Sequence, residues 1–99
     1  MKTILITGAA SGLGWALSQQ AFSLGHRVIM TDMNALLLAA RADALASQDP
    51  SRVTFHRLDV TDSDAITALV TLLKEKEGGL DVLINNAGIT HRSLADKTD

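Results

Sequence analysis

Residues 7–14 read TGAASGLG and follow directly on the short apolar run ILI at residues 4–6. Glycine destabilises the interiors of helices and strands, so glycines at positions 8, 12 and 14 predict a turn whose backbone is approached closely. A glycine-rich turn between a strand and a helix presents backbone N–H groups at the positive end of the helix, where a phosphate can bind. A plain structural turn would use glycine in the same way, so the turn alone leaves both interpretations open.

The apolar pattern around this turn predicts strands and helices in alternation. Near-continuous Val, Ile and Leu runs predict four strands, at residues 3–7, 27–32, 53–59 and 80–85. Such runs are typical of parallel strands that are covered on both faces. Three amphipathic segments separate the strands and predict right-handed crossover helices. The order β-α-β-α-β-α-β therefore predicts an α/β fold with a parallel sheet.

Each predicted helix has a boundary signal and an apolar stripe. The first, at about residues 13–24, ends at Gly25 in a left-handed conformation, and the second follows an N-cap at Asn34 and ends before Pro50. The third starts near Thr61, whose spacing to Asp64 resembles a capping box, and it stops at residues 78–79. The three predicted buried stripes are Leu13, Ala16, Leu17, Ala21 and Leu24; Leu38, Ala42 and Leu45; and Ile66, Leu69, Val70 and Leu73.

Composition narrows the classes of function. A chain of 99 residues with 46% apolar and 20% charged residues is expected to form one small globular domain. A net charge of −2 provides no basic surface for nucleic acid or for a membrane. The absence of cysteine excludes disulfides and thiol chemistry and suits a cytoplasmic protein. The three histidines are scattered, so no metal site is predicted.

Asp32 ends the second predicted strand, 18 residues after Gly14. In a dinucleotide-binding fold, a carboxylate at this place accepts hydrogen bonds from the adenosine ribose and repels a 2′-phosphate. Alternatively, Asp32 caps the next helix or sits in a turn. Together with the glycine turn, Asp32 favours the ribose role, and it predicts a small-molecule dinucleotide as the partner.

At this point the sequence resembles the short-chain dehydrogenase/reductase superfamily. TGAASGLG matches the family pattern T-G-x-x-x-G-x-G, Asp59-Val60 follow the third predicted strand, and NNAG at residues 85–88 follows the fourth. The resemblance implies a Rossmann-type doubly wound parallel sheet, incomplete at about four strands and three helices. It also implies that residues 1–99 are a single NAD-binding domain, truncated before the catalytic segment.

The resemblance implies which residues contact the cofactor. The glycine turn would surround the adenosine and the pyrophosphate, Asp59 and Val60 would contact adenine, and residues 86–88 would lie beside the ribose, while Thr7 and Asn85 tie the sheet together. NADP-preferring members carry basic residues where this chain has Ser11 and Met33, so NAD is favoured over NADP. The expected cofactor-binding residues are Gly8, Ser11, Gly12, Leu13, Gly14, Asp32, Asp59, Val60, Asn86, Ala87 and Gly88.

The catalytic residues of the family have no counterpart here. Members use a serine and a Tyr-x-x-x-Lys pair, in which tyrosine is the general acid/base, well C-terminal to NNAG. The chain contains no tyrosine and ends 11 residues beyond Gly88, and Ser93 and Lys97 come too early to serve. No catalytic residue is therefore assigned, and the 99-residue chain alone is expected to be inactive.

The fourth strand is expected to be an exposed apolar edge, so we expect a homo-oligomer or a missing C-terminal half. The leading hypothesis is the NAD-binding N-terminal portion of a short-chain oxidoreductase that transfers a hydride between NAD(H) and an alcohol/carbonyl substrate. The alternative is a non-catalytic nucleotide-binding or interaction module, or a truncation product. A methyltransferase with the same acid on the ribose is disfavoured by NNAG and by the glycine spacing. No substrate is indicated.

Overall fold

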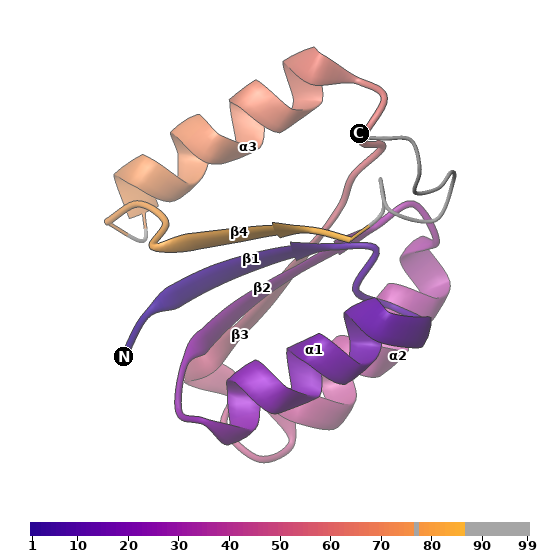
Figure 1. The fold of residues 1–99 in the computed structure, drawn as a ribbon, viewed down its shortest axis with the longest axis vertical. Helices are drawn as coiled ribbons and strands as arrows, with labels where there is room; N and C mark the ends of the chain where they lie inside the picture. Colours follow the sequence, from indigo (N-terminus) through magenta and orange to yellow (C-terminus); the bar gives the residue numbers. More distant parts are fainter. Residues whose placement is uncertain (77, 87–99) are drawn as a thin grey trace.

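A computed structural model describes residues 1–76 and 78–86 of the chain. Four parallel strands form one sheet in the order β3-β2-β1-β4, and helices connect them. The elements are β1 (Thr3–Thr7), α1 (Gly12–Ser23), β2 (Arg27–Asp32), α2 (Ala35–Ala46), the short 3₁₀ helix η1 (Pro50–Arg52), β3 (Val53–Arg57), α3 (Ser63–Lys76) and β4 (Val82–Asn85). Helices α1 and α2 cover one face of the sheet and α3 covers the other (Figure 1). The predicted doubly wound α/β fold is confirmed.

The two central strands are buried on both faces, as their continuous apolar sequences predict. Every residue of β1 is buried, and so are the four residues from Val28 to Thr31 of β2. Alternate side chains enter two separate cores. Ile4, Ile6, Val28 and Met30 pack in the core with α1 and α2, whereas Leu5 and Ile29 pack with α3.

Helix α2 follows its predicted pattern, and the start of α3 differs from it. The Asn34 side chain caps α2 by accepting a hydrogen bond from the Leu37 N–H at 3.1 Å, and the predicted stripe of α2 is the buried one. At α3 the cap is Asp62, which accepts from the Ala65 N–H at 3.1 Å. The predicted capping box that starts at Thr61 is therefore wrong, because the Thr61 hydroxyl donates to Asp59 instead. The predicted α3 stripe is correct in its two buried residues, Leu69 and Leu73.

The predicted stripe of α1 is mostly wrong. The helix buries Gly14, Ser18, Ala21 and Phe22, whereas Leu13 and Leu24 are 58% and 64% exposed. At the start of this face no side chain fits at position 14, because a Cβ there would collide with the carbonyl group of Gly8 in the turn that precedes the helix. Ser18 fits because its hydroxyl donates to the Gly14 carbonyl within the same helix at 2.8 Å. Gly25 ends the helix with φ +93°, as predicted.

Strands β3 and β4 are shorter than predicted. β3 ends at Arg57, and β4 begins at Val82. One backbone bond continues beyond each strand, from the Leu58 N–H to the Asp32 carbonyl at 3.0 Å and from the Asp81 N–H to the Thr3 carbonyl at 2.9 Å. The side-chain turn at Asp59 and the left-handed Gly79 redirect the chain at these two points.

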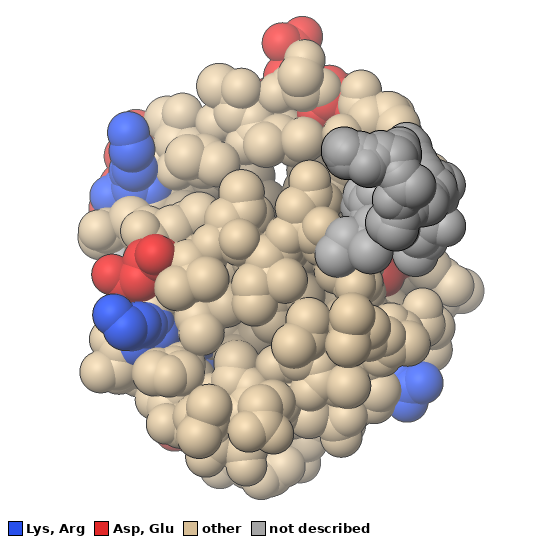
Figure 2. Space-filling model, viewed as in Figure 1, with Lys and Arg blue, Asp and Glu red and all other residues tan. Residues whose placement is uncertain are grey.

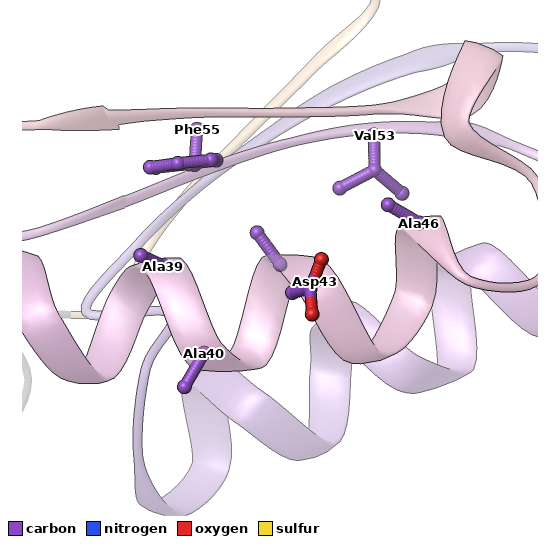
Figure 3. A pocket seen from close by; sticks show the side chains of 7 residues that line it. Ala39, Ala40, Asp43, Ala46, Val53 and Phe55 are labelled. Carbon is purple, nitrogen blue, oxygen red and sulfur yellow. The ribbon is translucent and has the colours of Figure 1, made fainter.

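Both outer strands leave an apolar side chain in solvent. Leu83 of β4 is 55% exposed and Phe55 of β3 is 47% exposed, so the predicted apolar edge at the fourth strand is confirmed. From the β4 side, most of the visible surface is uncharged (Figure 2). A groove of about 460 Å³ runs between α2 and β3, where Phe55 and Val53 face Ala39 and Ala46 (Figure 3). Among the helices that the structure describes, none combines the length and the apolar character that a membrane span requires.

Candidate functional site

The bend between β1 and α1 begins and ends with glycine. Gly8 has φ +63° and Gly12 has φ +56°, which is the left-handed region that favours glycine. A Cβ at Gly12 would meet no atom of the described residues within 4 Å, so none of them crowds the helix start on this side. Ser11, the N-cap residue, is exposed and makes no side-chain cap to the helix. An anion can therefore approach the N–H groups of the first turn of α1.

Gly14 is required for a different reason. A Cβ at this position would collide with the carbonyl group of Gly8 and would lie 2.8 Å from Nδ2 of Asn86. The close approach that the glycines predict is therefore present at Gly14, but the approaching group is the backbone of the bend itself. Gly14 is buried, whereas its neighbour Leu13 is exposed beside the bend.

Asp32 at the end of β2 holds the bend. Its Oδ2 accepts a hydrogen bond from the Ala10 N–H at 3.0 Å, and its Oδ1 accepts from the Asn34 N–H at 3.0 Å. The backbone supports this link, because the Ala9 N–H donates to the Thr31 carbonyl at 2.9 Å. Each oxygen of a carboxylate has a second lone pair, so Asp32 can still accept ribose hydroxyls. Asp32 thus faces the bend and also forms a turn, while Asn34 caps α2.

Arg41 of α2 reaches the same bend, and the sequence analysis missed it. Its Nε–H donates to the Ala10 carbonyl at 3.0 Å, and its guanidinium carbon lies 5.1 Å from the centre of the Trp15 ring. The signal that could have found Arg41 is its position next to Leu38 and Ala42 on α2, at the border of the buried stripe.

The end of β4 joins the other side of the bend. The Thr7 hydroxyl donates to Oδ1 of Asn85 at 2.9 Å, which confirms the predicted link between these two strands. Asn86 is buried, and its Nδ2 donates to the Gly8 carbonyl at 3.3 Å. Ala87 and Gly88, the other two predicted residues of this motif, lie outside the described residues.

Asp59 and Val60 follow β3 at the same edge of the sheet. Oδ1 of Asp59 accepts hydrogen bonds from the Thr61 hydroxyl at 2.7 Å and from the Thr61 N–H at 2.9 Å. These bonds, the hydroxyl bond most of all, hold the pKa of the Asp59 carboxyl below its ordinary value, so the group is a carboxylate at neutral pH. Val60 is half-buried and lines a small apolar cavity of about 90 Å³ between α3 and the sheet.

The carboxyl ends of the four parallel strands place one predicted residue each at the same edge of the sheet. Gly8 follows β1, Asp32 ends β2, Asp59 follows β3 and Asn86 follows β4. In open α/β sheets this is the edge at which ligands bind. Two larger hollows flank β3, and they are lined by none of the predicted cofactor residues. Within residues 1–76 and 78–86, no three His, Asp or Glu side chains gather as metal ligands would.

Comparisons with known proteins agree with this arrangement. A family model described as short chain dehydrogenase matches residues 2–99. Over 89 residues the chain is 40% identical to an uncharacterized oxidoreductase of Mycobacterium bovis, covering 90% of this chain and 35% of that protein. Over 89 residues it is also 40% identical to (-)-isopiperitenone reductase of Mentha piperita, covering 87% of this chain and 28% of that protein. The chain therefore spans about a third of the length of these relatives.

Two solved structures show the same fold with different coenzymes. A metagenomic short-chain oxidoreductase in complex with NADP superposes with a TM-score of 0.81 at 34% identity, over 89% of this chain and 39% of that one. A short chain dehydrogenase/reductase from Burkholderia phymatum in complex with NAD superposes with a TM-score of 0.77 at 32% identity, over 83% of this chain and 29% of that one.

Proposed function

The chain belongs to the short-chain dehydrogenase family, and we propose that it supplies the NAD-binding part of an oxidoreductase acting on an alcohol/carbonyl pair. When bound, the nicotinamide coenzyme supplies the hydride chemistry. The described residues of this chain bind and orient the adenosine half of that coenzyme. The observation that carries the proposal is the Asp32 carboxylate fixed against the glycine bend at 3.0 Å from the Ala10 nitrogen.

The open bend supports a role in holding the pyrophosphate. The first turn of α1 lacks a side-chain cap from Ser11, and a Cβ at Gly12 would meet no atom of residues 1–76 or 78–86 within 4 Å. A phosphate placed there would accept hydrogen bonds from the N–H groups of that turn and would lie at the positive end of the helix. Leu13, which is exposed beside the turn, would contact the coenzyme through its apolar side chain.

Asp32 supports NAD over NADP. Two backbone N–H donors hold its carboxylate in place, so the negative charge cannot easily turn away from the ribose. Two unit charges about 4 Å apart at a protein surface interact by about 4 kcal/mol, which is a large penalty for a 2′-phosphate beside Asp32. The coenzymes of the two similar structures differ, so the preference is proposed from this residue.

Calorimetric titration of the full protein with NAD⁺ and NADP⁺ tests the proposal. We expect tighter binding of NAD⁺ and a loss of about tenfold or more in NAD⁺ affinity for Asp32→Ala, because charge-assisted hydrogen bonds are removed. Asp43→Ala on α2 is the matched control, since Asp43 is exposed and lines the groove beside β3. A wild-type protein that binds neither coenzyme, or an Asp32→Ala variant that binds NAD⁺ unchanged, would overturn the proposal.

The second candidate function is that of a dinucleotide-binding module without catalytic activity. Residues 1–99 contain no tyrosine, so the general acid/base of the family is not among them. We propose that the 99-residue chain alone binds coenzyme without turning over an alcohol. The test of this inactivity is an assay in which the absorbance of NADH is followed with a panel of alcohols.

We further propose that the protein is cytoplasmic and that it forms a homo-oligomer through the exposed β4 edge. The mass of the protein in solution tests the oligomeric state.

A further inference from the structure

Arg41 and Asp32 contact opposite ends of the same residue. The Ala10 carbonyl accepts from Arg41 at 3.0 Å, and the Ala10 N–H donates to Asp32 at 3.0 Å. A cation on α2 and an anion at the end of β2 therefore approach the bend within one residue of each other. Since Asp32 is the group proposed to distinguish the two coenzymes, Arg41 lies beside the place where that distinction is made.

The Arg41 guanidinium is held in place and still has donors to offer. Its Nε–H is bonded to Ala10, and its carbon lies over the Trp15 ring at 5.1 Å. A guanidinium has five N–H donors in a planar fork that fits the oxygens of a phosphate. Within the described part of the chain, the structure gives the two Nη groups no acceptor. Arg41 is half-buried, so solvent screens its charge less than that of an exposed lysine.

We infer that Arg41 is a specificity-determining residue for the coenzyme. The inference rests on the proposed function and deepens it. Arg41 attracts a 2′-phosphate at the point where Asp32 repels it, so the preference for NAD over NADP is set by the balance of the two charges. Asp32 dominates, because it also accepts the ribose hydroxyls, and Arg41 reduces the discrimination against NADP by about tenfold.

The position of Arg41 differs from the two positions at which the family resemblance expects a basic residue. Those positions hold Ser11 on the bend and Met33 after β2. Arg41 reaches Ala10 from within α2, because α1 and α2 lie side by side on one face of the sheet (Figure 1). The contact therefore depends on helix packing and is not visible as a local motif.

A double-mutant cycle in the full protein tests the inference. The readout is the ratio of the dissociation constants of NADP⁺ and NAD⁺, measured by calorimetry at low salt for Arg41→Gln, Arg41→Lys, Asp32→Asn and the Asp32→Asn/Arg41→Gln double variant. We expect Arg41→Gln to raise the ratio about tenfold, and Arg41→Lys, which keeps the charge, to stay within about threefold of wild type. Asp32→Asn should lower the ratio, because NADP⁺ then binds more tightly relative to NAD⁺. The double variant should lose most of this improvement in NADP⁺ binding. Lys74→Gln, an exposed cation in the last turn of α3, is the charge control.

Each result decides the question. A purely structural Arg41 would weaken both coenzymes equally in Arg41→Gln, and that result overturns the inference while the proposed function stands. Equal ratios for Arg41→Lys and Arg41→Gln overturn it as well. Should Arg41→Gln fail to fold by circular dichroism, Asp32→Asn alone remains informative: its NADP⁺ affinity must fall more steeply with salt than its NAD⁺ affinity, and equal slopes overturn the inference. A folded wild type that binds neither coenzyme overturns both proposals.

Discussion

Asp32 and Ala10 are 22 residues apart in the sequence, and the carboxylate of the first accepts a hydrogen bond from the backbone N–H of the second at 3.0 Å. The bond is charge-assisted, which makes it stronger than a bond between neutral groups. The end of β2 therefore shapes the bend before any ligand arrives. A change at Asp32 acts on the bend and on the ribose site together.

Hydrogen exchange at two neighbouring amides can separate these effects. In Asp32→Ala we expect the Ala10 amide to exchange about tenfold faster or more, because its acceptor is lost. The Ala9 amide is the internal control, since it donates to the backbone carbonyl of Thr31 at 2.9 Å and keeps that acceptor. The measurement is amide exchange by NMR without ligand. An unchanged rate at Ala10 would show that the bond does not protect the bend.

Gly14→Ala and Gly12→Ala should differ in cost. The added Cβ at position 14 meets the Gly8 carbonyl, which is backbone and cannot move aside, so we expect a loss of about 3 kcal/mol or more in the free energy of unfolding. At Gly12 the Cβ meets nothing within 4 Å, and only the left-handed φ of +56° costs energy, about 1–2 kcal/mol.

Urea unfolding measures both values. Gly25→Ala is the matched control, because Gly25 is also left-handed and also has open space but lies at the other end of α1. We expect Gly25→Ala to cost as much as Gly12→Ala and to leave coenzyme binding unchanged. A Gly14→Ala variant as stable as Gly12→Ala would contradict the close packing of α1 on the bend.

Thr61→Val should raise the pKa of Asp59. The Thr61 hydroxyl is the main cause of the lowered pKa, and the Thr61 N–H bond remains in the variant, so the pKa should move part of the way back toward its ordinary value of 3.8. Because the folded pKa is lowered, the stabilisation from Asp59 is present above the pKa of the unfolded chain and is lost as the pH falls through the folded pKa. The difference in stability between wild type and variant should therefore shrink below about pH 4.

Carboxyl ¹³C shifts followed between about pH 2 and 6 measure this pKa directly. Asp49 is the internal control: its pKa is also lowered, chiefly by the Ser51 hydroxyl and then by Arg52, and it should not change in Thr61→Val. The same shift at both carboxyls would indicate a general change in the fold rather than a lost bond.

Leu83→Lys should reduce self-association. Leu83 is 55% exposed on β4, an outer strand of the described sheet, and charged residues on outer strands oppose edge-to-edge pairing. We expect a lower mass in solution at equal concentration, by analytical ultracentrifugation, with little change in stability. Phe55→Lys on β3 is the comparison, since Phe55 is 47% exposed on the opposite outer strand. If only Phe55→Lys lowers the mass, association occurs through β3 and not through β4.

The sequence predicted best what depends on local pattern. The limits of β1 and β2 are as predicted, because each has a continuous apolar centre, residues 4–6 in β1 and 28–30 in β2, and a glycine at position 8 or 25 lies close to one end. The Asn34 cap and the buried stripe of α2 are likewise as predicted, since a cap and a helical spacing are read within one element. The place of Asp32 at the end of β2 was also as predicted, whereas its hydrogen bond to the Ala10 N–H was not predicted.

The prediction failed where tertiary packing decides. The leucines of α1 were expected inside, but the helix buries Gly14, Ser18, Ala21 and Phe22 and leaves Leu13 and Leu24 exposed. At the start of the helix, the carbonyl group of Gly8 leaves no room for a side chain at position 14. The predicted cap of α3 was also wrong. The Thr61 hydroxyl donates to Asp59, and Asp62 caps the helix in its place. The contact of Arg41 was not predicted, since it joins α2 to the bend at Ala10 across 31 residues, and the position of Arg41 at the border of the α2 stripe does not identify its partner.

The order of the strands has a consequence for how the chain folds. β1 precedes the other three described strands in the sequence, and it lies in the interior of the sheet with β4, some 78 residues later, on one side. One of the two neighbours of β1, the strand β4, is therefore available for pairing only after Asn85 has been synthesised. The other neighbour, β2, can pair with β1 earlier, and β3 can pair with β2. Pairing over such a sequence distance is slow, so β1 stays an apolar strand that is covered along one edge only until residues 82–85 have been made and have paired with it.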